Sequence, residues 1–238
     1  MLARYLVDKI PMKNSLLNIQ LLLTGNEIMS GDTVDSNSAL IAQRFGEAGL
    51  GIYRKVTVGD DVTLLSTELA DMATKADLII VNGGLGPTID DLTAEILAAV
   101  AGVPLQEHPQ AVAHLERWCA KRNLQLDAAN LKQSMLPQGA TIVDNPIGSA
   151  VGFEMTLGNC RIICTPGVPS ELAAMLGPMV ADLAAQVQQA PGRNILRLQT
   201  FGLGESTAQQ IISDAVSDWP PEVELGFRAG APQMEIKL

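Results

Sequence analysis

Hydrophobic and polar residues alternate along the chain in two recurring patterns. Residues 18–25 and 77–84 are apolar runs that end in glycine, as buried strands often do, whereas residues 36–50 and 60–76 carry apolar side chains at helical spacing. This alternation of strand and helix predicts an α/β fold, with a mostly parallel sheet and helices on both faces. We expect further strands at 51–59, 140–146, 152–158 and 160–167, and further helices at about 90–101, 108–123 and 168–187.

The pattern changes near residue 187. Residues 188–194, QQAPGRN, have the composition of a linker. Beyond it the expected order is strand, helix, strand, strand, at 195–202, 206–216, 222–230 and 234–238. The sequence therefore predicts a leader at 1–17, an α/β domain at 18–187 and a small α+β unit at 194–238, which we expect to be truncated because it ends within a strand pattern.

Composition narrows the classes of function. The 238 residues are 47% hydrophobic but only 3% aromatic, so the core must be built from Ala, Val, Ile and Leu. The net charge of -10 argues against binding to nucleic acids or to anionic membranes. An acidic protein can still bind a phosphorylated ligand where helix N-termini or a divalent cation supply positive potential.

The remaining bulk features indicate a cytoplasmic protein. No apolar run approaches transmembrane length, and no signal peptide is visible. Three cysteines give no disulfide framework, and Cys160 and Cys164 would share one face of a strand as buried thiols. His108 and His114 match no metal-ligand spacing.

Three loops leave predicted strands at their carboxyl ends, at 24–32, 83–91 and 165–171. In an open α/β sheet the carboxyl edge is where ligands bind. We therefore expect these loops to converge on one pocket. The third, TPGVPSE, is equally consistent with a stiff turn before a helix, and its Gly167 is a candidate ligand contact.

The second loop, GGLGPTIDD, has the composition of an anion site. Gly83, Gly84 and Gly86 allow backbone N–H groups to approach a ligand closely. Thr88 or Asp90 can cap the helix that follows, which we expect to begin at about residue 90. A glycine-rich turn followed by a helix start favours phosphate binding.

Asp90 and Asp91 do not suit a bare phosphate, because carboxylates repel it. They suit a divalent cation that carboxylate and phosphate oxygens share. The alternative, at about even odds from the residues alone, is that Asp90 is an ordinary N-cap and Asp91 a partner of the helix dipole.

Other polar loop residues are weaker candidates. Glu27 follows the glycine that ends the first strand, although a solvated loop charge is its commoner role. Asp32 and Asp35 suit helix capping or a turn better than ligand binding. A separate loop, NPIGSAVG, offers polar groups or a plain hairpin; its candidates are Asn145, Gly148 and Ser149.

Five motifs in order carry a specific resemblance: LLLTGNEIMSGDTVDSNS, VTVGDD, DLIIVNGGLGPTIDDLT, NPIGSAVGF and CTPGVPSEL. Together they resemble the N-terminal domain of the competence/damage-inducible CinA family, over about residues 18–180. That domain shares its fold with the molybdopterin-binding domains of molybdenum-cofactor biosynthesis proteins. The tail resembles the family's small KH-like subdomain, and nothing matches the nicotinamide-mononucleotide deamidase domain of longer members.

The resemblance implies hydrolysis of the pyrophosphate of ADP-ribose to AMP and ribose 5-phosphate with a divalent metal, Mg, Mn or Co. It implies metal binding by Asp90 and Asp91, with Glu27 as a further ligand or as the base that activates water. The implied contacts to the phosphates and nucleotide are Gly83, Gly84, Gly86, Thr88, Asn145, Gly148, Ser149 and Gly167.

Two other functions stay open. One is molybdopterin binding or adenylylation; the other is a non-catalytic nucleotide-sensing module whose tail docks a partner. RNA binding through the tail's glycine loop is not expected, because FGLGES has Glu205 where a basic residue would be needed. We expect a nucleotide ligand and a homo-oligomer, with no nucleic acid and no membrane as partners.

Overall fold

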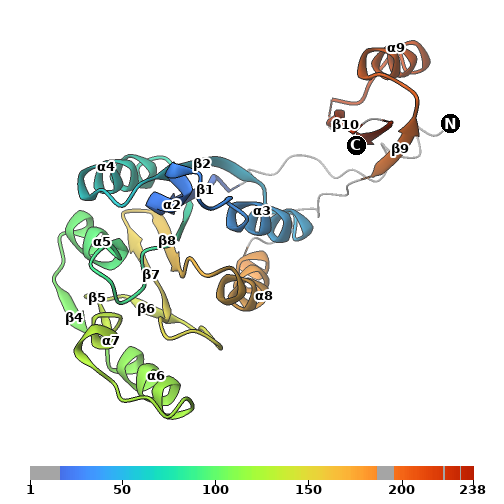
Figure 1. Ribbon diagram of the computed structural model, residues 1–238. Coiled ribbons are helices and arrows are strands. Elements are labelled where there is room, and N and C mark those ends of the chain that lie inside the picture. Colours follow the sequence, from blue (N-terminus) through green and yellow to red (C-terminus); the bar gives the residue numbers. More distant parts are fainter. Residues whose placement is uncertain (1–16, 187–195, 222, 231) are drawn as a thin grey trace. The chain divides into compact units, whose positions relative to one another are not determined.

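The computed structural model describes residues 17–186, 196–221, 223–230 and 232–238 (Figure 1). The chain divides into two compact units, one of residues 15–190 and another that contains residues 191–238. Each unit has its own sheet and its own hydrophobic core. The predicted leader, up to residue 16, and the predicted linker at 188–194 lie outside the described residues.

The larger unit is built on a sheet whose strands, within residues 17–186, follow the order β2-β1-β3-β8-β7-β6. The first four run parallel to one another, whereas β7 and β6 are antiparallel to their neighbours. This confirms the mostly parallel sheet. Its strands are β1 (Ile19–Thr24), β2 (Ile52–Val58), β3 (Leu78–Asn82), β6 (Thr141–Val143), β7 (Gly152–Leu157) and β8 (Cys160–Thr165).

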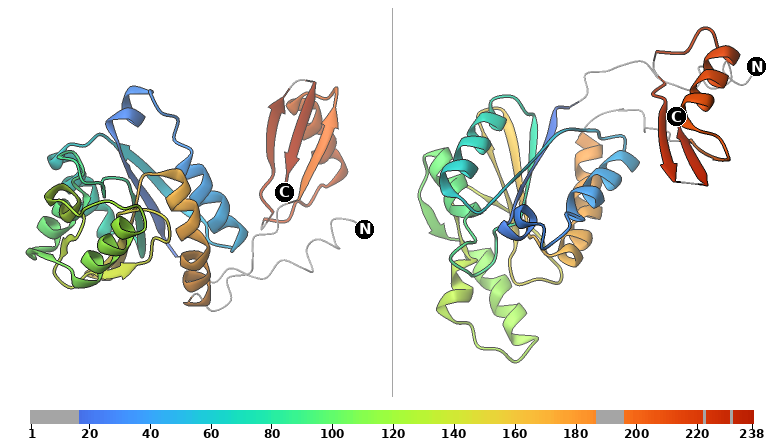
Figure 2. Two further views of the ribbon diagram at one scale, coloured as in Figure 1. Left: turned by 60° about the horizontal axis from the view of Figure 1, so that its bottom comes forward. Right: turned by 45° about the horizontal axis from the view of Figure 1, so that its top comes forward.

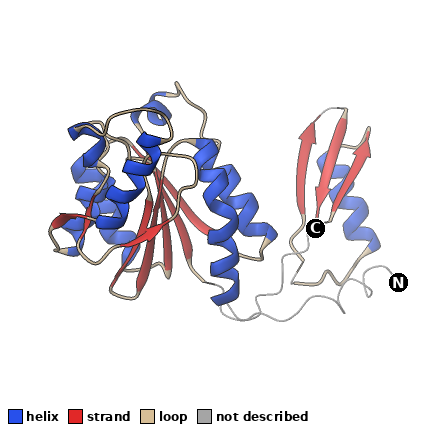
Figure 3. Cartoon of the chain, turned by 90° about the horizontal axis from the view of Figure 1, so that it is seen from below, coloured by secondary structure: helices blue, strands red, loops and turns tan. Residues whose placement is uncertain are grey.

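Helices cover both faces of this sheet, as predicted (Figure 3). On one face α3 (Asn37–Glu47) and α8 (Pro169–Gln186) pack against Leu21 and Leu23 of β1. On the other, α4 (Val62–Ala73) and α5 (Thr93–Ala101) pack in the cluster that contains Leu22. Because both sides of β1 are covered, the strand reads as a continuous apolar run.

Short elements were not predicted from the sequence. They comprise α2 (Asn26–Ser30), α7 (Ala128–Lys132) and an antiparallel pair of β4 (Leu105–Glu107) and β5 (Met135–Pro137). Elements of three to five residues are too short to establish a periodicity. The longer α6 (Pro109–Ala120) lies where a helix was expected.

The smaller unit, in its described residues, has a three-stranded antiparallel sheet in the order β10-β11-β9 with one helix on one face (Figure 2). Its elements are β9 (Arg197–Phe201), α9 (Glu205–Ala215), β10 (Gly226–Gly230) and β11 (Gln233–Lys237). The expected strand at 222–230 begins later, at Gly226. Two prolines precede it, and Val223 N donates to Pro220 O in a turn.

The cysteines behave as the sequence predicts. All three are buried free thiols, and burial raises the pKa of Cys160 to about 11. Such thiols are unreactive at neutral pH because the thiolate is the nucleophilic form. Among the described residues, none of the helices is long and apolar enough to cross a membrane.

Candidate functional site

Three loops meet at the carboxyl edge of the larger sheet. They follow β1, β3 and β8, which are adjacent parallel strands. Gly83 N donates to Thr165 O at 3.0 Å, and a Cβ on Gly167 would lie 3.4 Å from Gly83 Cα. A Cβ on Gly83 would come within 2.6 Å of Thr24 O. The loops therefore pack backbone against backbone at Gly83.

The buried side-chain amides of Asn82 and Asn37 fix this junction through hydrogen bonds. Asn82 Nδ2 donates to Pro166 O at 2.7 Å and to Thr165 Oγ1 at 3.1 Å. Asn37, at the start of α3, donates from Nδ2 to Asn82 Oδ1 and to Gly167 O. Asn37 and Asn82 were not among the predicted site residues. A polar residue that ends an otherwise apolar strand, as Asn82 does, is the signal that could have identified one of them.

The helix after the glycine-rich loop starts later than the sequence suggested. The expectation that α5 begins near residue 90 with a Thr88 or Asp90 cap is wrong, because α5 begins at Thr93 after Leu92, which supplies no side-chain cap. Thr93 instead ties the helix start to the glycines, since its Oγ1 donates to Gly83 O and its N to Gly84 O. The acidic pair thus belongs to the loop.

Asp90 and Asp91 converge on one hydroxyl group. Thr88 Oγ1 lies 2.5 Å from Asp90 Oδ1 and 2.5 Å from Asp91 Oδ2, and Thr88 N donates to Asp91 Oδ2 at 2.8 Å. The two carboxylate oxygens are therefore no more than 5.0 Å apart. A hydroxyl has one hydrogen to donate, so one of these short contacts has no proton between its oxygens.

The surroundings keep Asp90 ionised. The hydrogen bond from Thr88 is the main reason that the pKa of Asp90 is lowered, and the positive charge of Lys132 adds to the effect. Asp90 is fully exposed, so its charge is open to solvent ions. An ionised carboxylate next to a second one is a favourable arrangement for a divalent cation.

Lys132, at the end of α7, holds the acidic loop from the side. Its Nζ donates to Thr88 O at 2.5 Å and to Asp91 O at 2.8 Å, and lies 3.5 Å from Glu95 Oε1. The contacts with Thr88 and Asp91 are to backbone oxygens, so the lysine fixes the turn without bonding to the carboxylate oxygens of Asp90 or Asp91. No sequence signal marks Lys132, because it lies about 40 residues from the loop it contacts.

A small cavity lies between this loop, α5 and the segment from α7 to β5. Gln133, which lines it, donates from Nε2 to Leu85 O, while its buried Oε1 has no hydrogen-bond partner. The residues that line the cavity include Gly84, Gly86, Asp91, Glu95 and Lys132. The glycine-rich loop at 83–91 thus borders this cavity, and the polar side chains of Asp91, Glu95, Lys132 and Gln133 line part of it.

Glu27 lies in α2 instead of in a loop. Its carboxylate folds back toward Gly25, where a Cβ would lie 2.6 Å from Glu27 Oε1. In the described part of the chain, no three His, Cys, Asp or Glu side chains are grouped so that they could hold a metal ion. Glu27, Asp90 and Asp91 therefore do not form a ready-made three-ligand site.

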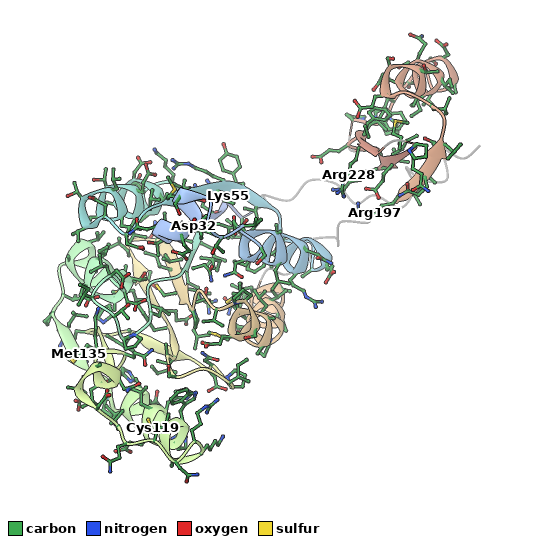
Figure 4. All side chains as sticks on the ribbon, in the orientation of Figure 1. Asp32, Lys55, Cys119, Met135, Arg197 and Arg228 are labelled. Carbon is green, nitrogen blue, oxygen red and sulfur yellow. The ribbon has the colours of Figure 1, made fainter. Side chains whose placement is uncertain are left out.

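Asp32 and Asp35 act locally, as the sequence suggested. Ser30 Oγ donates to Asp32 Oδ2 at 2.7 Å within the loop. Asp35 accepts from Ser38 N at 2.9 Å, and so caps the first turn of α3, and Lys55 Nζ lies 3.2 Å from its Oδ2. Figure 4 shows Asp32 and Lys55 in the same part of the larger unit.

Asn145 organises a fourth loop that joins the third. Its Nδ2 donates to Ala150 O and Glu171 Oε2, and its Oδ1 accepts from the N–H groups of Ile147 and Gly148. An Asn side chain has two donor hydrogens and two acceptor lone pairs, so all are used inside the protein. Asn145 therefore shapes the loop.

The same loop is held by α6 and by the residues directly after it. Trp118 Nε1 and Arg122 Nη2 both donate to Ile147 O, and the Arg122 guanidinium lies over the Trp118 ring at 4.2 Å. His114 Nε2 lies 2.9 Å from Gly148 O. Ser149, half-buried, is the remaining polar candidate of this loop.

Comparison with known proteins identifies the larger unit. A family model described as "Probable molybdopterin binding domain" matches residues 20–186. The crystal structure of "the protein CinA with unknown function" from Thermoplasma acidophilum superposes with a TM-score of 0.65 at 32% identity, over 70% of this chain and 98% of that one. The chain belongs to the CinA family. The loops at the carboxyl edge all lie within the matched residues.

CinA-like proteins of known sequence extend the match. The chain is 51% identical to a CinA-like protein of Colwellia psychrerythraea over 92% of its own length and 51% of the relative's. It is 38% identical to one of Shewanella sediminis over 93% of its length and 52% of the relative's. The chain thus spans about half the length of the curated CinA-like relatives it matches. The molybdopterin-binding-type fold and CinA membership expected from the motifs are confirmed.

Proposed function

We propose that the larger unit binds the pyrophosphate of ADP-ribose at the carboxyl edge of its sheet and, with a divalent cation, hydrolyses it to AMP and ribose 5-phosphate. One water adds to a phosphorus atom and one P–O–P bond breaks, so the atoms balance. The observation that carries the proposal is the acidic turn of Thr88, Asp90 and Asp91, which stands beside a glycine junction where three loops meet.

The glycine junction supports phosphate binding. Gly83 and Gly84 adopt φ values of 111° and 67°, in the region that favours glycine. Gly83 is buried and donates its N–H to Thr165 O, whereas Gly84 is half-buried and has no side chain that would keep a ligand from the backbone. The start of α5 adds the positive end of a helix dipole, and Leu92 leaves it without a side-chain cap. A phosphate is attracted to both features.

The acidic turn fits a divalent cation. Two carboxylate oxygens within 5.0 Å of each other, one on a fully exposed aspartate, are oxygen donors of the kind that Mg and Mn prefer. When bound, a divalent cation offsets the charge that builds on the pyrophosphate oxygens. In this proposal Asp90 and Asp91 hold the cation.

Glu27 would supply a third ligand or the base that takes a proton from the attacking water. Glu27 lies on the short exposed helix α2, which follows β1. Because the helix is exposed, the Glu27 side chain can change its rotamer at low cost. Gly167 and Ser149 would line the nucleotide on the side of β8 and the Asn145 loop.

A second candidate is binding of a molybdopterin-type pterin phosphate, which the description of the matched family favours. The same glycine junction would hold its phosphate. A third possibility is nucleotide sensing without turnover. Two measurements distinguish the three functions: which ligand raises the melting temperature of the protein, and whether AMP is released from ADP-ribose.

The test is AMP release, followed by chromatography, from ADP-ribose and related dinucleotides with Mg²⁺, Mn²⁺ or Co²⁺ and with a chelator. The proposal expects AMP and ribose 5-phosphate in equal amounts when a divalent metal is present, and neither product when the chelator is added. Stabilisation by ADP-ribose without AMP would leave a sensing module, and stabilisation by a pterin phosphate instead would favour the second candidate.

A further inference from the structure

The smaller unit presents two chemically different faces of one sheet. Met234 and Ile236 of β11 are buried with Ala208 of α9, so the residues between and beside them project from the opposite face. Glu235 and Lys237 are among these. The face away from α9 is the sheet's open face in the described residues.

Strand pairing carries the same alternation across the sheet. Glu235 is paired with Arg228 on β10 and with Gln199 on β9, so the three share the open face. In the same way Lys237 is paired with Arg197, and Gln233 with Phe201. We call Arg197, Phe201, Arg228, Glu235 and Lys237 the basic sheet face.

In the described part of this unit, the lysine and arginine side chains all lie on that face. Arg197, Arg228 and Lys237 are the Lys and Arg residues among its described residues, and all three lie on the basic sheet face. Figure 4 shows Arg197 and Arg228 on the side of the small sheet away from α9. With Glu235 as the acidic member, the face carries a net +2 within a chain of net charge -10.

Two of the three cations have no acidic partner among the residues that the structure describes. Arg197 Nη1 lies 2.6 Å from Glu235 Oε1, and Gln199 Nε2 donates to Glu235 Oε2 at 3.1 Å, so Glu235 is engaged by β9. Within residues 196–221, 223–230 and 232–238, Arg228 and Lys237 make no ion pair. Their charge is available to an anionic partner.

An aromatic ring stands on the same face. Phe201, at the end of β9, is 74% exposed, which is unusual for a phenylalanine. Its row holds Gln233 and Gly230, so no bulky neighbour covers the ring across the strands. An exposed aromatic on a sheet face that also carries two unpaired cations combines base stacking with phosphate attraction.

We propose that the basic sheet face binds single-stranded nucleic acid, with Arg228 and Lys237 on the phosphates and Phe201 stacked on a base. Phe201 is the first residue of FGLGES, but Arg228 and Lys237 lie on β10 and β11 and not in that glycine loop, whose lack of basic residues argued against RNA binding there. The basic sheet face is independent of the hydrolase activity proposed for the larger unit. The polar residues Gln199 and Gln233 give the face too little apolar area for membrane insertion.

Fluorescence anisotropy with labelled oligo(dT) and oligo(rU) of about 12 nucleotides tests the proposal. The full chain should bind both, and affinity should fall with salt with a log–log slope of about -1.4 to -2, from about 0.7 per neutralised phosphate. The R228Q/K237Q variant should bind about tenfold more weakly and lose about 1.4 of that slope. Phe201→Ser should weaken binding about fivefold or more and leave the slope unchanged.

The matched control is R44Q/K75Q, which removes two exposed positive charges from the larger unit and also changes the net charge from -10 to -12. It should bind like the parent. Glu235→Gln should bind about threefold more tightly, because it removes the one acidic group of the face. This gain cannot arise from a damaged fold.

Three results with oligonucleotides would overturn the proposal: no binding at about 50 mM salt, an equal loss in the R44Q/K75Q control, or binding that Phe201→Ser and Glu235→Gln leave unchanged. Vesicles with anionic lipid provide the remaining comparison. If they bind the chain as tightly as the oligonucleotides and with the same variant pattern, the face recognises anionic surfaces in general and the nucleic-acid assignment fails.

Discussion

The carboxyl edge of the larger unit and the basic sheet face of the smaller one place charge by different means. Asp90 and Asp91 stand on an irregular loop, where Thr88 and Lys132 fix the turn through specific hydrogen bonds. The cations of the basic sheet face stand on regular strands, where alternation alone decides which way they project. The acidic site therefore depends on individual contacts, whereas the basic face depends on strand register.

The comparison also shows what a net charge conceals. The value of -10 is a sum over the whole chain, and it describes neither the acidic turn nor a face of +2. Partners respond to local potential within about 10 Å at ordinary salt. Charge is informative about function once it has been assigned to a face of the fold.

The largest expected effect is on the acidic turn. Asp90→Asn and Asp91→Asn should each lower metal-dependent AMP release from ADP-ribose about 100-fold or more, because each removes a charge that holds the cation. The melting temperature without metal should hold steady, since an asparagine oxygen can still accept the Thr88 hydrogen bond. Both quantities are measured on the same preparations.

Asp61→Asn is the matched control for the acidic turn. Asp61 caps α4 by accepting from Leu64 N, and asparagine caps equally well, so activity and stability should both be retained. Parent-like hydrolysis by the Asp90 and Asp91 variants would show that the acidic pair serves the turn alone.

A smaller effect tests whether the loop edge is a close-packed backbone surface. Gly83→Ala should cost about 2 kcal/mol of unfolding free energy, because φ is 111° and the new Cβ would lie 2.6 Å from Thr24 O. Gly102→Ala is the control, with φ of 68° but no atom within 4 Å, and should cost about 1 kcal/mol. Urea denaturation measures both, and equal losses would contradict the close approach at Gly83.

Much of this edge could be predicted from the sequence. Apolar runs ending in glycine located β1 and β3, and parallel topology placed their loops at one edge. The start of α5 could not be predicted. The carboxylate of Asp91 accepts a hydrogen bond from Thr88 N, and this bond holds the residues before the helix in a turn. A capping sequence and a loop turn use the same residue types.

Long-range partners were the main omission. Lys132 reaches Thr88 and Asp91 across about 40 residues, and Asn37 reaches Gly167 across a larger gap. Neither contact leaves a periodic trace in the sequence. The basic sheet face was missed for a related reason: Arg197 and Arg228 are far apart in sequence, and the pairing through β11 is what brings them together.

The contact of Lys132 with the acidic turn leads to a further prediction. Lys132→Met should raise the metal concentration needed for half-maximal AMP release about tenfold, because Thr88 O and Asp91 O lose their common donor and the turn loosens. Lys132→Arg should recover part of the loss. Lys121→Met, at the exposed end of α6, should behave as the parent. Unchanged metal dependence in the Lys132 variant would mean that the turn holds its shape unaided.

The smallest effect concerns Asp35, an acid near the same edge that, unlike Asp90, is paired with a cation. Burial alone would raise its pKa, but hydrogen bonds from Ser38 and Lys55 outweigh burial and leave the pKa lowered from 3.8. A carboxyl whose pKa is lowered in the folded state stabilises the protein above its unfolded pKa and loses that contribution as pH falls through the folded value. The paired charge therefore contributes at neutral pH and not in strong acid.

Asp35→Asn keeps the cap of α3, because asparagine can accept from Ser38 N, but loses the ion pair with Lys55. The variant should be about 0.5 kcal/mol less stable at pH 7, a value kept small by solvent screening at the half-exposed lysine. The difference should shrink as pH falls below 3.8. Urea denaturation at neutral and acid pH measures it. A difference that persisted in acid would assign the loss to the altered cap, and Asp35 would then differ from Asp90 in its hydrogen bonds alone.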